Sequence, residues 1–180
     1  MKSLRVICPA LLLLACTAAF AQHEMKNETP QSQAEQSFAK LKTLAGTWTG
    51  KVTVAEHPEM TGPMDRVTFR VTSLGNALMH EMTTAQRPDD PITMIYLDGD
   101  RLLLTHFCDA GNRPRMTGKV SPDGKTFQFE MVDITGSTKY GHMRGVVFTQ
   151  VDADHHTEDW TFVEPGDTIV HAHMDLERTK

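Results

Sequence analysis

Cysteine is scarce in this chain, with three residues in 180. Two of them, Cys8 and Cys16, lie in the first 21 residues, where a positively charged start precedes an apolar run too short to span a bilayer. That pattern, followed by Ala19-Phe20-Ala21, is typical of a cleaved secretory signal peptide. Cleavage would leave Cys108 alone, so we expect an exported protein that folds without an intramolecular disulfide.

Positive charge is also scarce. Once residues 1–21 are removed, 16 of the 18 basic residues remain against 23 acidic ones, and the net charge is −7. Binding to nucleic acid or to an anionic membrane needs a concentrated basic patch that displaces counterions, and the sequence contains no such patch. We therefore expect neither partner.

Long hydrophobic runs are missing after residue 21, so we expect no transmembrane segment, and any membrane attachment would be through lipid. Leu13-Leu14-Ala15-Cys16 resembles a bacterial lipobox. A lipid anchor on Cys16 therefore stands as the alternative to cleavage before Gln22. Both alternatives predict export, either to the periplasm or to the cell surface.

The remaining chain divides into a leader and one domain. Residues 22–35 are rich in Gln, Glu, Asn and Ser, a composition that predicts a disordered leader. From residue 36 the pattern changes, because Phe38, Leu41 and Leu44 recur at helical spacing before Gly46 and predict a short amphipathic helix. Residues 36–180 are of a length that suits a single domain with an adequate core.

Ten short apolar or alternating stretches follow this helix. Tight-turn sequences such as Asp98-Gly99-Asp100 and Ser121-Pro122-Asp123-Gly124 separate several of them. Hairpin connections without further helices predict an all-β fold, a single antiparallel up-and-down barrel of about ten strands with a short N-terminal helix. The predicted strands are residues 48–54, 67–72, 77–82, 92–97, 101–108, 115–120, 127–131, 146–151, 157–163 and 168–178.

Gly46-Thr47-Trp48, between the helix and the first strand, resembles the signature of the lipocalins and the wider calycin superfamily. The stretch of residues 44–50 is similar to nitrobindins and to related bacterial lipocalin-like families of unknown function. The resemblance implies a calycin-like barrel in which Trp48 closes one end beneath Arg178 of the last strand. Because nitrobindins bind haem through a histidine of the final strand, it also implies haem as a candidate cofactor, with His173, beside His171, as its ligand.

The strands that separate best into two faces predict the interior of the barrel. An eight- to ten-stranded barrel either encloses a small ligand or is filled by its own side chains. We expect a small apolar or amphipathic ligand, held without catalysis, with His106 and Arg115 as polar contacts near the rim. The predicted apolar lining consists of Val67, Phe69, Val71, Met94, Tyr96, Phe127, Phe129 and Met131.

Histidines and methionines leave other functions open. In the last strand, His171 and His173 alternate with apolar residues, which places both on the outer face unless a bulge changes the register. The same pair offers imidazole ligands to zinc or copper, and methionines beside histidines, as at Met79-His80, suit copper. A barrel filled by its own side chains would instead be an interaction module of the cell envelope.

Catalytic motifs are missing. The sequence has no nucleophile elbow, phosphate-binding loop, paired-cysteine zinc site or dinucleotide fingerprint. His106 and Cys108 share a strand face, where they could act as a base and a nucleophile, or simply as a buried thiol beside a hydrogen-bonded histidine. Binding is therefore the favoured function, and we expect no cofactor.

Overall fold

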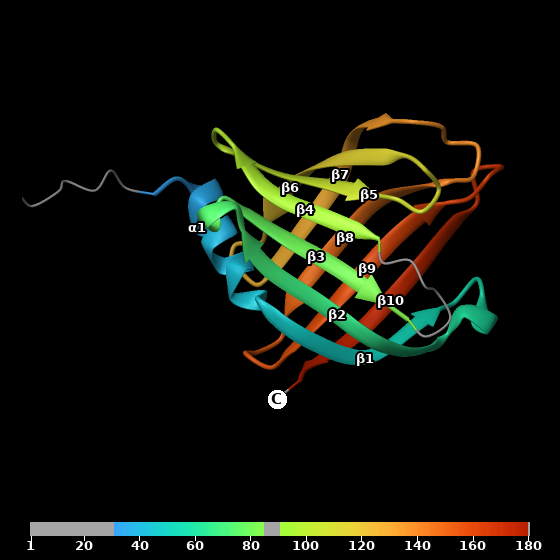
Figure 1. Cartoon of the computed structure of the whole chain (residues 1–180), viewed down its shortest axis with the longest axis horizontal. Helices are drawn as coiled ribbons and strands as arrows, with labels where there is room; N and C mark the ends of the chain where they lie inside the picture. Colours follow the sequence, from blue (N-terminus) through green and yellow to red (C-terminus); the bar gives the residue numbers. More distant parts are fainter. Residues whose placement is uncertain (1–30, 85–90, 180) are drawn as a thin grey trace, which may run out of the picture. The chain divides into compact units, whose positions relative to one another are not determined.

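The computed structural model describes residues 31–84 and 91–179. The predicted signal peptide, Cys16 and residues 22–30 of the predicted leader lie outside the described residues. Within the described part, one α-helix is followed by ten strands, which form a barrel (Figure 1).

Helix α1, Gln33–Leu41, begins three residues before its predicted start and continues into the short 3₁₀ helix η1, Lys42–Leu44. The earlier start has a local cause, because Ser32 and Glu35 form a capping box. The Ser32 hydroxyl accepts from the Glu35 amide at 3.2 Å, and the Ser32 amide donates to the Glu35 carboxylate at 2.7 Å. Such a cap stabilises a helix by about 1 kcal/mol, so residues 33–35 belong to the helix.

The ten strands form one closed antiparallel barrel, which confirms the predicted fold class. Each strand pairs with the next one in the sequence, and β1 pairs with β10 to close the sheet (Figure 1). The strands are β1 Gly46–Val54, β2 Gly62–Thr72, β3 Ala77–Thr83, β4 Ile92–Asp98, β5 Arg101–Phe107, β6 Arg113–Val120, β7 Thr126–Thr135, β8 His142–Gln150, β9 His155–Val163 and β10 Ile169–Arg178. Two further 3₁₀ helices, η2 Pro58–Met60 and η3 Ser73–Gly75, lie before and after β2.

The closure between β1 and β10 depends on a glycine. Gly50 is opposite Leu176 in the register, and a Cβ atom at position 50 would overlap the backbone oxygen of Asp175. At the same place the pairing of β1 with β2 shifts between Trp48 and Gly50. A glycine therefore lets the first strand bend and approach the last strand closely enough to complete the barrel.

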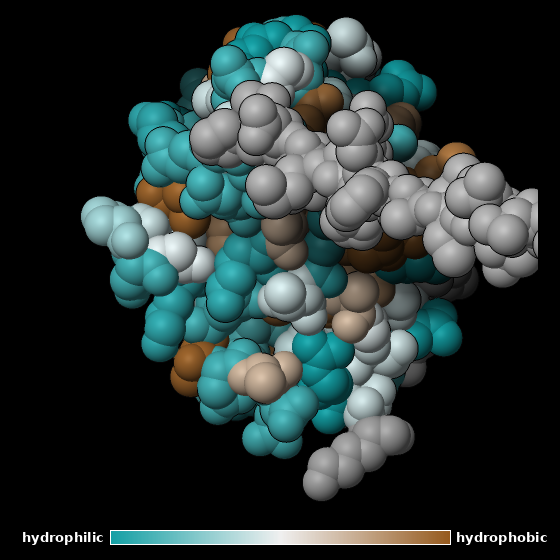
Figure 2. All heavy atoms as spheres, turned by 90° about the vertical axis from the view of Figure 1, so that its left-hand side faces the viewer, coloured by the Kyte–Doolittle hydropathy of each residue, from teal (hydrophilic) through white to brown (hydrophobic). Residues whose placement is uncertain are grey.

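Trp48 and Arg178 lie together at the α1 end of the barrel. The guanidinium carbon of Arg178 is 4.0 Å from the centroid of the Trp48 ring, the arrangement that the resemblance to calycins implies. Arg178 also donates to the backbone oxygens of Ala45 at 2.8 Å and Thr43 at 3.1 Å. These contacts hold the link between α1 and β1 against the last strand. Where it is drawn in colour, the outer surface at this end is mostly hydrophilic (Figure 2).

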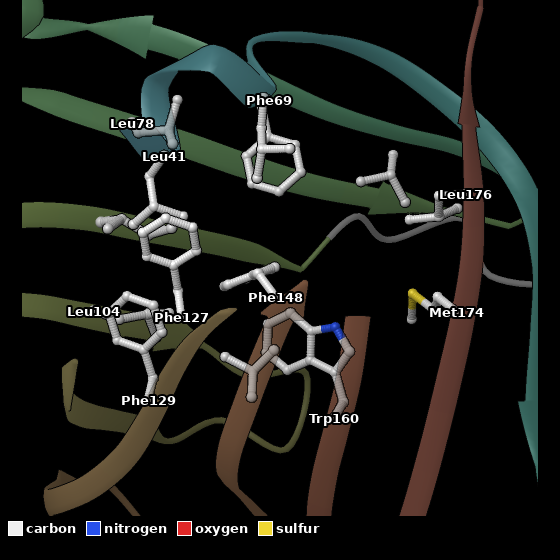
Figure 3. Close-up of a cluster of buried hydrophobic side chains, with 14 of the residues drawn as sticks. Leu41, Phe69, Leu78, Leu104, Phe127, Phe129, Phe148, Trp160, Met174 and Leu176 are labelled. Carbon is white, nitrogen blue, oxygen red and sulfur yellow. The ribbon is translucent and has the colours of Figure 1, made fainter. Parts of the chain in front are cut away.

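The interior near α1 is filled by aromatic and aliphatic side chains (Figure 3). Phe69, Phe129 and Phe148 come from three strands and meet edge to face, with ring centroids 5.8 Å and 6.0 Å apart. Phe127 is completely buried in the same cluster. Trp160 lies between this cluster and Met174 (Figure 3). This half of the barrel therefore encloses packed side chains.

Candidate functional site

A cavity of about 720 Å³ occupies the barrel at the end opposite α1. Its residues come from the end of β1, the start of β2, the ends of β3, β5 and β9, and the start of β10. The volume falls within the range of pockets that hold small organic molecules. The apolar part of the wall is formed mainly by Val52, Val54, Met64, Met82, Val170 and Met174, while His106 and Trp160 form a partly polar base.

The predicted lining residues are divided between this cavity and the packed half. His106 lines the cavity. Val67, Phe69, Phe127 and Phe129 are at most 2% exposed and belong to the packed core. Met131 is partly buried against the same core. Alternation placed these apolar residues on the inner face, but most of them fill the barrel near α1.

Three other predicted lining residues lie outside the enclosed interior. Val71 shares the face of Phe69 but lies near the end of β2, where it is 39% exposed. Met94 and Tyr96 lie on the outer face of β4, because the alternate residues Thr93 and Ile95 are completely buried. The sequence of β4 is apolar on both faces, so hydrophobicity alone could not show which face is inside.

Arg115, predicted as a polar ligand contact, lies on the outer face of β6. It forms an ion pair with Asp133 across the pairing of β6 with β7, and both side chains are about half exposed. The hydrogen bond from Arg115 to Asp133 and the negative charge of Asp133 raise the pKa of this guanidinium. The structure therefore places Arg115 in a surface ion pair, away from the cavity.

A buried polar cluster lies next to the cavity base, and the sequence analysis missed it. The Glu158 carboxylate accepts hydrogen bonds from His80 Nε2 at 3.2 Å, His156 Nε2 at 3.1 Å and Trp160 Nε1 at 2.8 Å. His80, His156 and Glu158 are completely buried. Because His80 comes from β3 and the other three from β9, the cluster joins two strands across the interior.

Opposing effects set the pKa of Glu158. Burial alone raises the pKa of a carboxyl group, but the positive charge on His80 and the hydrogen bonds from His156 and His80 outweigh burial. The pKa of Glu158 therefore lies below its ordinary value, and the carboxylate is ionised at neutral pH. Aromatic rings surround the imidazoles, with Trp48 4.2 Å from His156 and Phe69 4.6 Å from His80, measured between ring centroids.

One ring nitrogen of each clustered histidine remains without a hydrogen bond. The Nδ1 atoms of His80 and His156 are buried and have no partner within the described part of the chain. An unsatisfied buried polar atom costs about 1–3 kcal/mol, so the surrounding barrel stabilises a cluster that is not fully satisfied.

His106, at the cavity base, differs from the clustered histidines because it has no carboxylate partner. Its Nδ1 lies 2.8 Å from the hydroxyl of Thr93, which is completely buried, and its ring is 5.4 Å from that of Trp160. Burial, together with the charge on His80, lowers the pKa of His106 to about 4. His106 is therefore neutral at pH 7 and presents an uncharged polar group at the cavity base.

A signal for the cluster was present in the sequence. His156, Glu158 and Trp160 are spaced by two residues in one strand, and such residues share a face. Because the indole of Trp160 is mostly apolar, the face that carries it is the inner one, and Glu158 and His156 follow it inward. The alternation of this strand was not used in the sequence-based prediction, so the pattern was missed.

At the mouth of the cavity, histidine–carboxylate contacts connect the loop between β1 and β2 with the chain segment that follows β9. His57, just before η2, contacts Glu59 at 3.1 Å and Glu164, the residue after β9, at 3.0 Å. All three line the cavity. The hydrogen bond with Glu59 and the negative charges of Glu59 and Glu164 raise the pKa of His57 despite its partial burial.

The last-strand histidines lie on the outer face, as their alternation indicates. His171 Nδ1 contacts Glu56 at 3.0 Å, and that hydrogen bond lowers the pKa of Glu56 to about 2. His173 Nδ1 contacts Asp159 at 2.6 Å. Neither histidine lines the cavity, and among the described residues no group of three or more His, Cys, Asp or Glu is placed to hold a metal ion.

Comparison with known proteins adds information on the fold only. No family model matches the sequence, and no curated protein matches it. A solved structure of a protein of unknown function from the DUF3598 family of Nostoc punctiforme is similar, with a TM-score of 0.53 and 10% sequence identity. The similarity covers 77% of this chain and 48% of that protein, so the chain spans about half the length of its structural neighbour.

The fold and the cavity together define a class of protein. It is a ten-stranded antiparallel barrel, consistent with a calycin-like architecture, with a hollow at one end. None of the helices found in residues 31–84 and 91–179 is long and apolar enough to cross a membrane.

Proposed function

We propose that the protein binds a small, largely apolar molecule in the cavity and does not transform it. The cavity itself carries this proposal, because a volume of about 720 Å³ with valine and methionine walls is suited to burying an apolar ligand. Methionine side chains are flexible and adapt to ligands of irregular shape.

Binding is favoured over catalysis by the position of the ionised groups. Glu158, the strongest candidate for a general base in the interior, already accepts hydrogen bonds from three side chains and does not line the cavity. Trp160 donates one of these hydrogen bonds and itself lines the cavity, so its indole ring separates Glu158 from the cavity. A bound molecule would therefore meet the indole ring before the carboxylate.

The haem and copper alternatives gain no support from the last strand, whose histidines contact surface carboxylates. His171 and His173 remain outside the cavity, and no register shift is found between β10 and its neighbours β1 and β9.

A tryptophan introduced into the cavity wall tests the binding proposal. Val52 lines the cavity, whereas its neighbour Thr53 is exposed on the outer face of β1. The fluorescent apolar probe N-phenyl-naphthylamine is titrated into the wild-type protein, Val52→Trp and Thr53→Trp. We expect the wild type and Thr53→Trp to bind the probe alike, and Val52→Trp to bind it about tenfold or more weakly, a loss of about 1.4 kcal/mol.

Equal binding by all three proteins, or no binding by any, would contradict a ligand-holding cavity. Equal urea-unfolding midpoints of the two variants show that the comparison concerns binding and not stability.

We also propose that the protein is exported, with residues 1–21 as its signal peptide. The full chain is produced in a bacterium, and the cell fractions are examined by intact mass spectrometry. A mature chain beginning at Gln22 is the expected product, while a lipid-modified chain beginning at Cys16 would establish the lipoprotein alternative. An unprocessed chain confined to the cytoplasm would contradict export.

A further inference from the structure

The cavity base offers one unused hydrogen-bonding atom. His106 is 1% exposed, and its Nδ1 is engaged by the fully buried Thr93 hydroxyl. Within residues 31–84 and 91–179 this is the hydrogen bond found for the ring, and because His106 lines the cavity, its Nε2 is left for a ligand. A ligand that supplies a hydrogen-bonding group at this point gains the pairing of a polar atom that is otherwise largely enclosed by protein.

The base cannot compensate a negative charge on that ligand group. Because His106 is neutral at pH 7, it contributes a dipole and no positive charge. The His80 imidazole beside it already contacts the Glu158 carboxylate, at 3.1 Å. Moving a carboxylate out of water into such surroundings costs several kcal/mol unless a cation pairs with it.

The walls and the mouth lead to the same conclusion. None of the described residues that line the cavity is lysine or arginine. At the mouth, the carboxylates of Glu59 and Glu164 share the single imidazole of His57. Two carboxylates against one imidazole give this group of three no net positive charge, so it does not attract an anionic ligand.

We infer that the cavity selects an uncharged amphipathic ligand whose hydroxyl or carbonyl group hydrogen-bonds to His106 while its apolar body lies along the valine and methionine walls, and that it discriminates against carboxylate anions of the same size. This inference rests on the proposed binding function and specifies the class of ligand. It leaves out Arg115, which the sequence predicted as a second polar contact and which lies in an ion pair on the outer face.

Three ligands with the same alkyl chain separate the possibilities: dodecanol, dodecanoate and dodecane. Each competes with N-phenyl-naphthylamine for the full-length mature protein at neutral pH. We expect dodecanol to bind at least about tenfold more tightly than dodecanoate, because only the anion leaves a charge unpaired.

Variants at position 106 then identify the contact. In His106→Leu we expect dodecanol to bind about 3- to 10-fold more weakly, the net effect of one hydrogen bond, and dodecane to be unaffected. His106→Gln keeps a hydrogen-bonding side chain and should restore most of the dodecanol affinity. Phe107→Leu, a change on the exposed outer face of the same strand, is the matched control and should leave all three affinities unchanged.

Two results would overturn the inference while leaving the binding function intact. One is dodecanoate binding as tightly as dodecanol. The other is an equal loss of dodecanol and dodecane affinity in both position-106 variants, which would mean that His106 only supports the cavity shape. If the probe binds to no protein in the set, the binding function fails, and the inference fails with it.

Discussion

Replacing Glu158 with alanine is expected to destabilise the barrel by about 3–5 kcal/mol, the loss found when one partner of a buried ion pair is removed. The carboxylate is completely buried and is the common acceptor for His80, His156 and Trp160. Without it, three donors in the interior lose their partner at once. The free energy of unfolding in urea at neutral pH measures the effect.

Two further variants separate the sources of this loss. Glu158→Gln keeps an acceptor oxygen of nearly the same shape but removes the negative charge, so its loss should be smaller than that of alanine. Glu177→Ala removes an exposed glutamate from β10 and should change stability by no more than about 0.5 kcal/mol. A similar small change for Glu158→Ala would mean that the cluster does not hold β3 and β9 together.

The barrel itself could be predicted from the sequence because its determinants are local. Period-two alternation, as in Val67 and Phe69, and tight turns such as Asp98-Gly99-Asp100 specify strands and hairpins one after another. When every connection is predicted to be a hairpin, the pairing of the first strand with the last is the remaining contact needed to define the barrel. The helix start was missed by three residues because Ser32 and Glu35 act through their side chains, and hydrophobic periodicity does not register a cap.

The location of the cavity could not be predicted in the same way. Alternation assigns a residue to the inner face, but it does not show how far along the strand the interior is filled. Phe127 and Phe129 are on the inner face and pack at the α1 end, while Val52 and Met174, also on inner faces, border the hollow. That difference depends on how side-chain volumes from ten strands add up at each level of the barrel, which is a property of tertiary structure.

The polar interior was missed for a different reason. Histidine and glutamate are seldom fully buried unless they are paired, so the sequence alone did not point to His80, His156 and Glu158 as a buried group. His80 and its partner Glu158 are 78 residues apart in the sequence, so no local pattern reveals their pairing. For His156 and Glu158 of β9, the inner position of Trp160 was the available signal in the sequence. The position of His80 in the cluster could be seen only in the three-dimensional structure.

His106 is expected to make the barrel less stable in mild acid. Its pKa falls from 6.5 in an exposed histidine to about 4 in the folded protein, so between these values the unfolded chain binds the proton and the folded protein does not. Stability therefore rises with pH across this interval and falls as the pH is lowered through it. With about 1.4 kcal/mol for each tenfold change in proton affinity, His106 should account for a loss of about 2–3 kcal/mol between about pH 7.5 and pH 4.5.

Comparison with His106→Gln isolates this contribution, because glutamine does not titrate and the other ionisable groups are common to both proteins. His57 acts in the opposite direction: its pKa is raised by folding, so the stability it contributes is present at low pH and is lost as the pH rises through its folded value. The difference between the two unfolding free energies, measured in urea at each pH, cancels this effect. If the wild type and His106→Gln lose the same stability on acidification, His106 is not the buried neutral group from which the preference for an uncharged ligand was inferred.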